Sequence, residues 1–113
     1  MIRRGEIWWA NLPTPAGSEP GHRRPVVIVQ SDVFNTTRLR TFIGVALTGN
    51  VGLADLPGNV KLSSEAVGLD RDSVANITQI VTGDRSVLTE CIGELPEREL
   101  RKLEAGLRLV LDL

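Results

Sequence analysis

The residues best suited to chemistry lie in one short segment of this sequence. Glu19, His22, Arg23 and Arg24 occupy a Gly- and Pro-rich stretch that leads directly into the β-branched run 26–29, which is typical of a buried strand. The planar guanidinium of an arginine at a strand end can grip two phosphoryl oxygens at once. Arg24 is therefore the strongest candidate for an anion-binding or catalytic arginine. The alternative is an ordinary surface salt bridge from Arg24 to Glu19 or Asp32.

Several kinds of site are excluded by what the chain lacks. One histidine and one cysteine among 113 residues form no His/Cys cluster at metal-ligand spacing. The glycines do not form a P-loop or a dinucleotide-binding fingerprint, so we predict neither a metal nor a cofactor. Cys91 is alone and is expected to be a small structural strand residue.

Composition places the chain among ordinary soluble proteins. No apolar run approaches the roughly 20 residues that cross a bilayer, and the charged N-terminus does not resemble a signal peptide. We therefore expect no membrane association and a cytoplasmic location. The net charge is −1, but residues 1–40 carry a surplus of three positive charges. This split is compatible with a local basic face, and equally with a randomly charged surface.

The elements that must position these residues are mostly short strands. We expect strands over residues 6–10, 26–30, 41–47, 59–62, 73–81 and 90–94, a single helical turn over 31–35 capped by Ser31, and a helix that begins at Pro96. These parts predict a mainly β fold, a small and strongly bent antiparallel barrel with a C-terminal helix, in which residues 1–113 form a single domain with one core.

Alternation along the strands predicts which faces their side chains occupy. Trp8 and Trp9 must point to opposite faces, so one of them meets a partner or a second subunit, unless Trp9 covers the terminal helix. In the strand over residues 73–81, Ala75, Ile77 and Val81 are expected to share one face.

Several short motifs follow one another along nearly the whole chain: Arg4-Gly5-Glu6-Ile7-Trp8, Gly17-Ser18-Glu19, Arg24-Pro25-Val26-Val27-Ile28-Val29, Thr48-Gly49-Asn50, Gln79-Ile80, Asp84-Arg85 and Ile92-Gly93. Their order and spacing resemble the MazF/PemK family, the endoribonuclease toxins of bacterial type II toxin–antitoxin systems. The resemblance implies an SH3-like barrel, a homodimer, sequence-selective and metal-independent cleavage of single-stranded RNA such as mRNA, and inhibition by a cognate antitoxin. Gly49 stands where family members often carry serine.

The resemblance also implies roles for individual residues. Arg24 would stabilise the transition state and Thr48 would be the second catalytic residue, which orients a hydroxyl or a phosphate oxygen; the alternative for Thr48 is capping of a turn. Without a metal or an enzymatic nucleophile, the attacking group must be the RNA's own 2′-hydroxyl, which gives a 2′,3′-cyclic phosphate and a 5′-hydroxyl. Either Glu19 or His22 would supply the base, and imidazole titrates closer to neutrality.

RNA binding would involve further residues, namely Arg23, Arg38, Asn50, Gln79 and Arg85. Because the chain has only two Trp and two Phe, we expect base recognition to depend mostly on hydrogen bonds. Two other functions remain open at this point. One is a non-catalytic, CcdB-like toxin or binding module of the same fold that acts on a protein target, and the other is an inactive family member that retains antitoxin binding.

Overall fold

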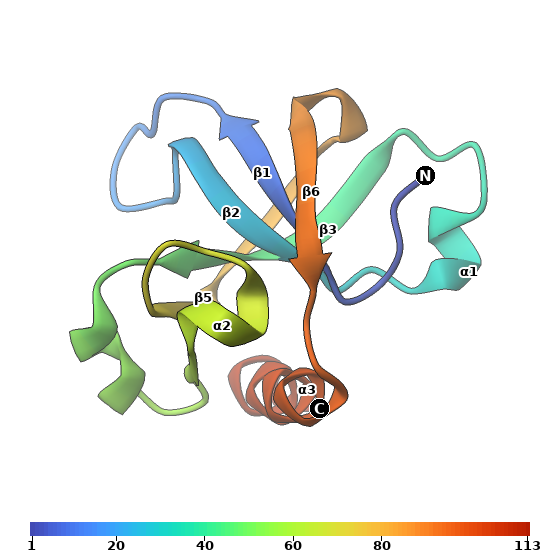
Figure 1. Ribbon diagram of the computed structural model, residues 1–113. Helices are drawn as coiled ribbons and strands as arrows, with labels where there is room; N and C mark the ends of the chain where they lie inside the picture. Colours follow the sequence, from blue (N-terminus) through green and yellow to red (C-terminus); the bar gives the residue numbers. More distant parts are fainter.

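The strands form a single curled antiparallel sheet in the computed structural model, which describes residues 1–113 (Figure 1). They are β1 (Glu6–Leu12), β2 (His22–Ile28), β3 (Thr41–Thr48), β4 (Val60–Leu62), β5 (Ser73–Asp84) and β6 (Leu88–Glu94). Their order across the sheet is β4-β5-β3-β2-β1-β6. The predicted mainly β fold is therefore confirmed, although the edge strands β4 and β6 do not pair with each other, so the barrel is not fully closed.

Helices cover the open parts of the sheet. They are α1 (Asp32–Asn35), α2 (Ser64–Val67) and α3 (Glu97–Leu111), with 3₁₀ turns η1 (Val51–Asp55) and η2 (Arg85–Val87). The predicted cap of α1 is confirmed, because Ser31 Oγ accepts a hydrogen bond from the Val33 amide at 3.2 Å. The sequence did not predict α2, η1 or η2. None of these helices has the length and apolar character needed to span a membrane.

The long helix α3 packs against β4 and β5 and lies below the sheet in Figure 1. Gly106 makes this packing close, because a Cβ on Gly106 would lie only 2.3 Å from the carbonyl oxygen of Gly58. From sequence Gly106 is expected only to weaken the helix. The structure shows why a glycine is needed there: the backbone of the η1–β4 loop occupies the space that any side chain would take.

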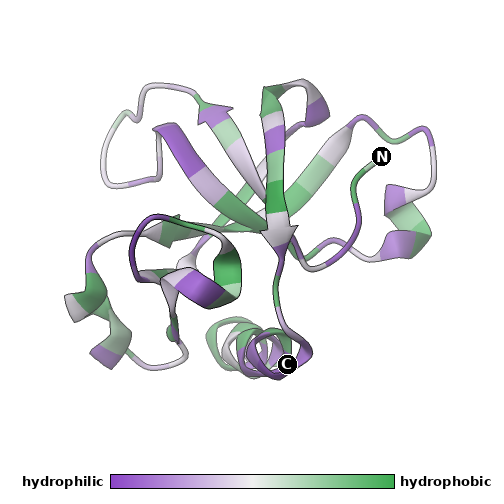
Figure 2. Cartoon of the chain, in the orientation of Figure 1, coloured by the Kyte–Doolittle hydropathy of each residue, from purple (hydrophilic) through white to green (hydrophobic).

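Strand β2 begins four residues earlier than predicted, at His22 rather than Val26. The residues His22 to Arg24 look like a loop in the sequence because they are polar, but they pair with Leu12, Asn11 and Ala10 of β1. Figure 2 shows the resulting change along β2, from hydrophilic at its first residues to hydrophobic near the centre of the sheet. Arg24 therefore lies inside a paired strand, which fixes its backbone.

The buried apolar residues form two clusters on opposite faces of the sheet, not the single core expected. Val27 belongs to the larger cluster, with Ile7 and Leu47, whereas its neighbours Val26 and Ile28 belong to the smaller one. The tryptophans follow the same division. Trp8 packs against the smaller cluster, and its indole nitrogen donates to Glu6 at 3.1 Å, so the prediction that Trp8 and Trp9 point to opposite faces is confirmed.

One predicted face is wrong, because β5 contains an irregularity. Val45 pairs with Ile80 but Leu47 pairs with Ala75, so several residues of β5 lie opposite the single residue Ala46. This bulge interrupts the alternation of side chains. As a result Ala75 and Ile77 lie in the larger cluster, whereas Val81 packs against the smaller one on the other face.

Candidate active site

Arg24 and Thr48 lie at the same end of two neighbouring strands. The β2–β3 ladder pairs Val27 with Val45 and ends where Val26 pairs with Ala46. Arg24 of β2 and Thr48 of β3 each lie two residues beyond this last pair, on the strand face that also carries Val26 and Ala46. Two residues more than twenty positions apart in sequence are thereby brought to one strand end.

Arg24 has no ionic partner within the chain. Its Nε is buried and makes no hydrogen bond, and none of the ion pairs in the molecule includes it. Glu19 and Asp32, the acids that could have formed a surface salt bridge with Arg24, are engaged elsewhere. That alternative is therefore wrong, and the guanidinium is left to meet an anion from outside.

Thr48 is held by the turn that follows β3. Its Oγ1 accepts a hydrogen bond from the Asn50 amide at 3.2 Å, and the Asn50 side chain in turn accepts from the Gly52 amide at 3.2 Å. The structure thus confirms that Thr48 caps the turn after β3. This cap does not use the hydroxyl proton, which remains available for donation because a hydroxyl both donates and accepts.

Glu19 closes the loop between β1 and β2. Its carboxylate accepts hydrogen bonds from the Gly17 and Ala16 amides, at 2.6 and 3.1 Å. Hydrogen bonds from its own amide and from those of Gly17 and Ala16 lower the pKa of the Glu19 carboxyl. A carboxylate held in this way is a weaker base than an ordinary glutamate.

His22 lies two residues before Arg24 at the beginning of β2. Its side chain is exposed, its amide donates to the carbonyl of Pro13 at 3.4 Å, and its φ of 60° is in the left-handed region. A non-glycine residue in that region is uncommon. The preceding residue, Gly21, packs closely against Pro15, because a Cβ on Gly21 would lie 2.3 Å from the Pro15 ring. The loop thus fixes the backbone that carries the imidazole.

Arg23 lies on the other face of β2. Its guanidinium carbon is 4.1 Å from the centre of the Trp9 ring, which is a cation–π contact. The suggestion that Trp9 covers the terminal helix is therefore wrong: Trp9 packs with Arg23 and Pro25 at the open end of the sheet.

The remaining predicted binding residues occupy different places. Gln79 lies half-buried in the β5 bulge opposite Ala46, two residues from Thr48. Arg38 is exposed in the loop before β3, at the opposite end of that strand. Arg85 lies at that far end as well, and its guanidinium donates to the carbonyls of Thr41, Asn35 and Phe34 at 3.1–3.2 Å. Within one chain, the structure brings Gln79 towards Thr48 and keeps Arg38 and Arg85 away from it.

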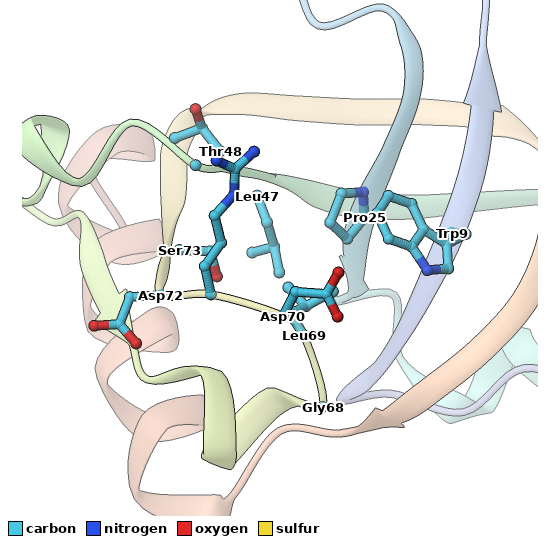
Figure 3. A pocket seen from close by; sticks show the side chains of 11 residues that line it. Trp9, Pro25, Leu47, Thr48, Gly68, Leu69, Asp70, Asp72 and Ser73 are labelled. Carbon is cyan, nitrogen blue, oxygen red and sulfur yellow. The ribbon is translucent and has the colours of Figure 1, made fainter.

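A cavity of about 340 Å³ opens beside Thr48 (Figure 3). Trp9, Pro25, Leu47 and Gly49 line it together with the segment 68–73. Within this segment, Arg71 places its guanidinium beside Gly49: a Cβ on Gly49 would lie 3.6–3.7 Å from its atoms. Sequence reasoning missed Arg71. The available signal was the charged triplet Asp70-Arg71-Asp72 directly before a strand, which parallels the position of Arg24.

No three His, Cys, Asp or Glu side chains come together as a group that could hold a metal ion. The chemistry that this end of the sheet offers in its own residues is therefore that of a guanidinium without an ionic partner, a hydroxyl with a free proton and an exposed imidazole. Such a set suits binding of an anion and transfer of protons beside it.

Several solved structures share this fold. The chain superposes on MazF from Deinococcus radiodurans with a TM-score of 0.83, at 22% identity over 99% of this chain and 97% of that one. It also superposes on a mycobacterial endoribonuclease solved in complex with its cognate antitoxin, with a TM-score of 0.79 at 20% identity, over 100% of this chain and 97% of that one. At these identities the likeness shows the fold.

Sequence comparison gives the family. Residues 3–111 match the model of the PemK-like, MazF-like toxins of type II toxin–antitoxin systems. The chain is 48% identical over its full 113 residues to endoribonuclease MazF6 of Mycobacterium tuberculosis, covering 99% of that protein. It is 34% identical over the same length to endoribonuclease EndoA of Bacillus subtilis, covering 97% of it. The chain belongs to the PemK-like, MazF-like toxin family, and the predicted enzyme class agrees with the names of these full-length relatives.

Proposed function

We propose that the protein is a sequence-selective, metal-independent endoribonuclease that cleaves single-stranded RNA, such as mRNA, by attack of the RNA's own 2′-hydroxyl. The observation that carries this proposal is the free guanidinium of Arg24 at the strand end that also holds Thr48. Family membership and the names of the full-length relatives support it.

The proposed step forms one bond and breaks one. The 2′-oxygen attacks the adjacent phosphorus and loses its proton to a base, while the bond from phosphorus to the 5′-oxygen breaks and that oxygen gains a proton. The products are a 2′,3′-cyclic phosphate and a 5′-hydroxyl. Arg24 stabilises the charge that accumulates on the phosphoryl oxygens, since a guanidinium stays charged and gives up a proton reluctantly. Thr48 donates a hydrogen bond to one of these oxygens or to the attacking hydroxyl.

His22 is the better candidate for the base. It lies two residues before Arg24 at the beginning of β2, and its side chain is exposed. Glu19 is disfavoured because its hydrogen bonds to backbone amides lower the pKa of its carboxyl and hold it in the loop. We assign Glu19 the role of ordering the loop that presents His22.

Binding of the RNA extends beyond these groups. Gln79 reads or positions a nucleotide near Thr48, and Asn50 acts through the turn that it stabilises. Arg23, held over Trp9, contributes positive charge on the other side of β2. Arg38 and Arg85 lie too far along β3 to join the same phosphate, so any contact they make is to another part of the strand or requires the second subunit.

The partners that we propose are a second copy of the chain and a cognate antitoxin, and the proposed location is the cytoplasm. The relative of mycobacterial origin solved with its antitoxin supports the second partner. The exposed side chains of Val33, Phe34 and Leu39 near α1 support association with another protein surface. Light scattering at micromolar concentration tests the dimer, for which we expect twice the chain mass of 12.3 kDa.

Replacement of Arg24 tests the function. We expect Arg24→Ala to lower kcat/KM for RNA cleavage by about two to three orders of magnitude, the usual effect of removing one stabilising donor. Arg24→Lys keeps the charge but not the two-pronged geometry, and is expected to recover only part of that loss. Arg98→Ala, which removes an exposed arginine of α3 that forms no ion pair, is the matched control.

The same variants distinguish the alternative function. A CcdB-like toxin that acts on a protein target should keep its toxicity when Arg24 is replaced, provided that the variant has the thermal midpoint of the original protein. If folded Arg24→Ala remains as toxic and cleaves RNA as fast as the original protein, the proposed role of Arg24 is wrong.

A further inference from the structure

The cavity beside Thr48 contains two charged groups that the fold itself does not use. Asp70 and Arg71 are exposed, and neither side chain forms an ion pair or a hydrogen bond within the chain. Asp72 differs, because its carboxylate accepts from the Ser64 amide at 2.9 Å. Figure 3 shows the Asp70 carboxylate directed towards Trp9 across the cavity, whereas the Asp72 carboxylate turns away. Asp70 is thus free to meet a ligand.

The other walls suit a flat, partly polar ligand. Trp9 and Pro25 form an apolar side, and Ser73 also lines the cavity but is only 4% exposed, with its hydroxyl buried. Ser73 Oγ has no hydrogen-bond partner, although buried polar atoms are normally paired. An aromatic wall beside the exposed carboxylate of Asp70 suits a nucleobase, because its faces stack and its edge forms hydrogen bonds.

We propose that this cavity binds one base of the RNA strand next to the cleaved bond, and that Asp70 selects a base that carries an exocyclic amino group. The proposal rests on the function proposed above. Thr48 lines the cavity, whereas Trp9 and Pro25 lie on the face of β1 and β2 opposite Arg24. An RNA strand that meets Arg24 would therefore pass over the ends of β2 and β3 to seat a base in the cavity. Arg71, whose guanidinium lies over Gly49 at the cavity rim, is placed to hold a neighbouring phosphate.

The selectivity follows from the chemistry of the carboxylate, which only accepts hydrogen bonds. Adenine, cytosine and guanine each present an amino group that donates to it. Uracil presents a ring N–H between two carbonyl oxygens, and these repel a carboxylate. An acid in an RNA-binding cavity would otherwise be unfavourable, because it repels the phosphates. Asp70 therefore has a use in RNA recognition only as an acceptor for a base.

A panel of short RNAs tests the proposal with the full-length protein. The RNAs are identical except for the base at each position flanking the cut, and kcat/KM is measured for each. At one position we expect amino-bearing bases to be preferred over uracil by about fivefold to a hundredfold. Asp70→Asn should reduce this preference to nearly nothing at that position alone, because an amide both donates and accepts. Arg71→Gln should weaken binding of all RNAs alike and make it less dependent on salt.

The control is Asp112→Asn, which removes the same charge at the C-terminal end of α3, where the positive φ of 57° also suits asparagine. It should leave every preference unchanged. If Asp70→Asn cleaves RNA with the base preferences of the original protein, the proposal is overturned while the proposed function stands, and the cavity is left to a protein partner. If the original protein cleaves none of these RNAs nor a long mRNA, the proposed function itself fails.

Discussion

The amide of Asn50 donates a hydrogen bond to Thr48 Oγ1 at 3.2 Å, which fixes the direction in which the Thr48 hydroxyl can act. With one of its two lone pairs engaged, the hydroxyl keeps its proton and one lone pair for the substrate. We propose that Thr48 acts as a donor to the RNA rather than as the base of the reaction. This agrees with the weak basicity of an alcohol.

Replacement of Thr48 tests whether its hydroxyl is needed for cleavage. We expect the isosteric Thr48→Val to lower kcat/KM by about two to three orders of magnitude, because both the donor and the acceptor for Asn50 are lost. Thr48→Ser keeps both and should retain most activity. Steady-state cleavage of one RNA by both variants is the measurement, with thermal midpoints recorded alongside. If Thr48→Val cleaves RNA as fast as the original protein, the donor role of the hydroxyl is wrong.

The contact between α3 and the η1–β4 loop makes a prediction about stability. Alanine at position 106 would improve helix propensity by about 1 kcal/mol, but its Cβ would lie 2.3 Å from the Gly58 carbonyl oxygen. We expect the cost of overpacking to exceed the gain in helix propensity, so that Gly106→Ala lowers the free energy of unfolding by about 1–3 kcal/mol. The urea midpoint measures it. The exposed neighbour serves as control, since Ala105→Gly should cost only about 1 kcal/mol. A stabilised Gly106→Ala variant would contradict this packing.

The hydrogen bonds of Asp32 lead to a prediction about how folding stability depends on pH. Its Oδ1 accepts from Asn35 Nδ2 at 2.9 Å and from the Arg4 amide at 2.8 Å, and these bonds lower the pKa of the Asp32 carboxyl. Because the folded pKa is below the unfolded value of about 3.9, the stabilisation is present above that value and is lost as the pH falls through the lowered pKa. Asp32→Asn should thus be less stable at pH 7 and lose less stability on acidification below about pH 4.

Thermal midpoints between neutral pH and strong acid measure this difference. Asp55→Asn, at an exposed carboxylate that accepts no hydrogen bond, should keep the acid dependence of the original protein. If Asp32→Asn follows the original protein at every pH, the hydrogen bonds of Asp32 do not contribute to folding.

A further prediction concerns metals. The residues of this chain form no group of three potential ligands, so excess EDTA should leave the rate of RNA cleavage unchanged at constant ionic strength. Complete loss of cleavage that one divalent ion restores, and monovalent salt does not, would contradict the metal-independent mechanism.

The sequence predicts the strands and the terminal helix well because their patterns are local. Runs such as residues 26–29, and the leucines of α3, carry their periodicity within a single segment. Local patterns do not predict the early start of β2, because residues 22–24 are polar and become strand only through pairing with β1. Local patterns do not predict the β5 bulge either, since the register between two strands is not a property of either strand's sequence alone.

The candidate site divides in the same way. Arg24 and Thr48 are predictable from the motifs that surround them, and the structure brings both to one end of the sheet. The cavity that holds Asp70 and Arg71 is not predictable in this way, because it requires the segment before β5 to pack beside the end of β3. The engagement of Arg85 by three carbonyls likewise depends on contacts between residues about fifty positions apart.

The central claim is that the substrate supplies the nucleophile while Arg24 and Thr48 stabilise the transition state. The most direct test is an RNA with one deoxyribose immediately 5′ to the cleaved phosphate. We expect cleavage at that bond to be abolished and binding to fall little, because phosphates and bases are unchanged. The same substitution one nucleotide away should leave cleavage nearly intact. If the deoxy-substituted strand is still cut at that bond, water is the nucleophile, and the roles assigned to Arg24 and Thr48 are wrong.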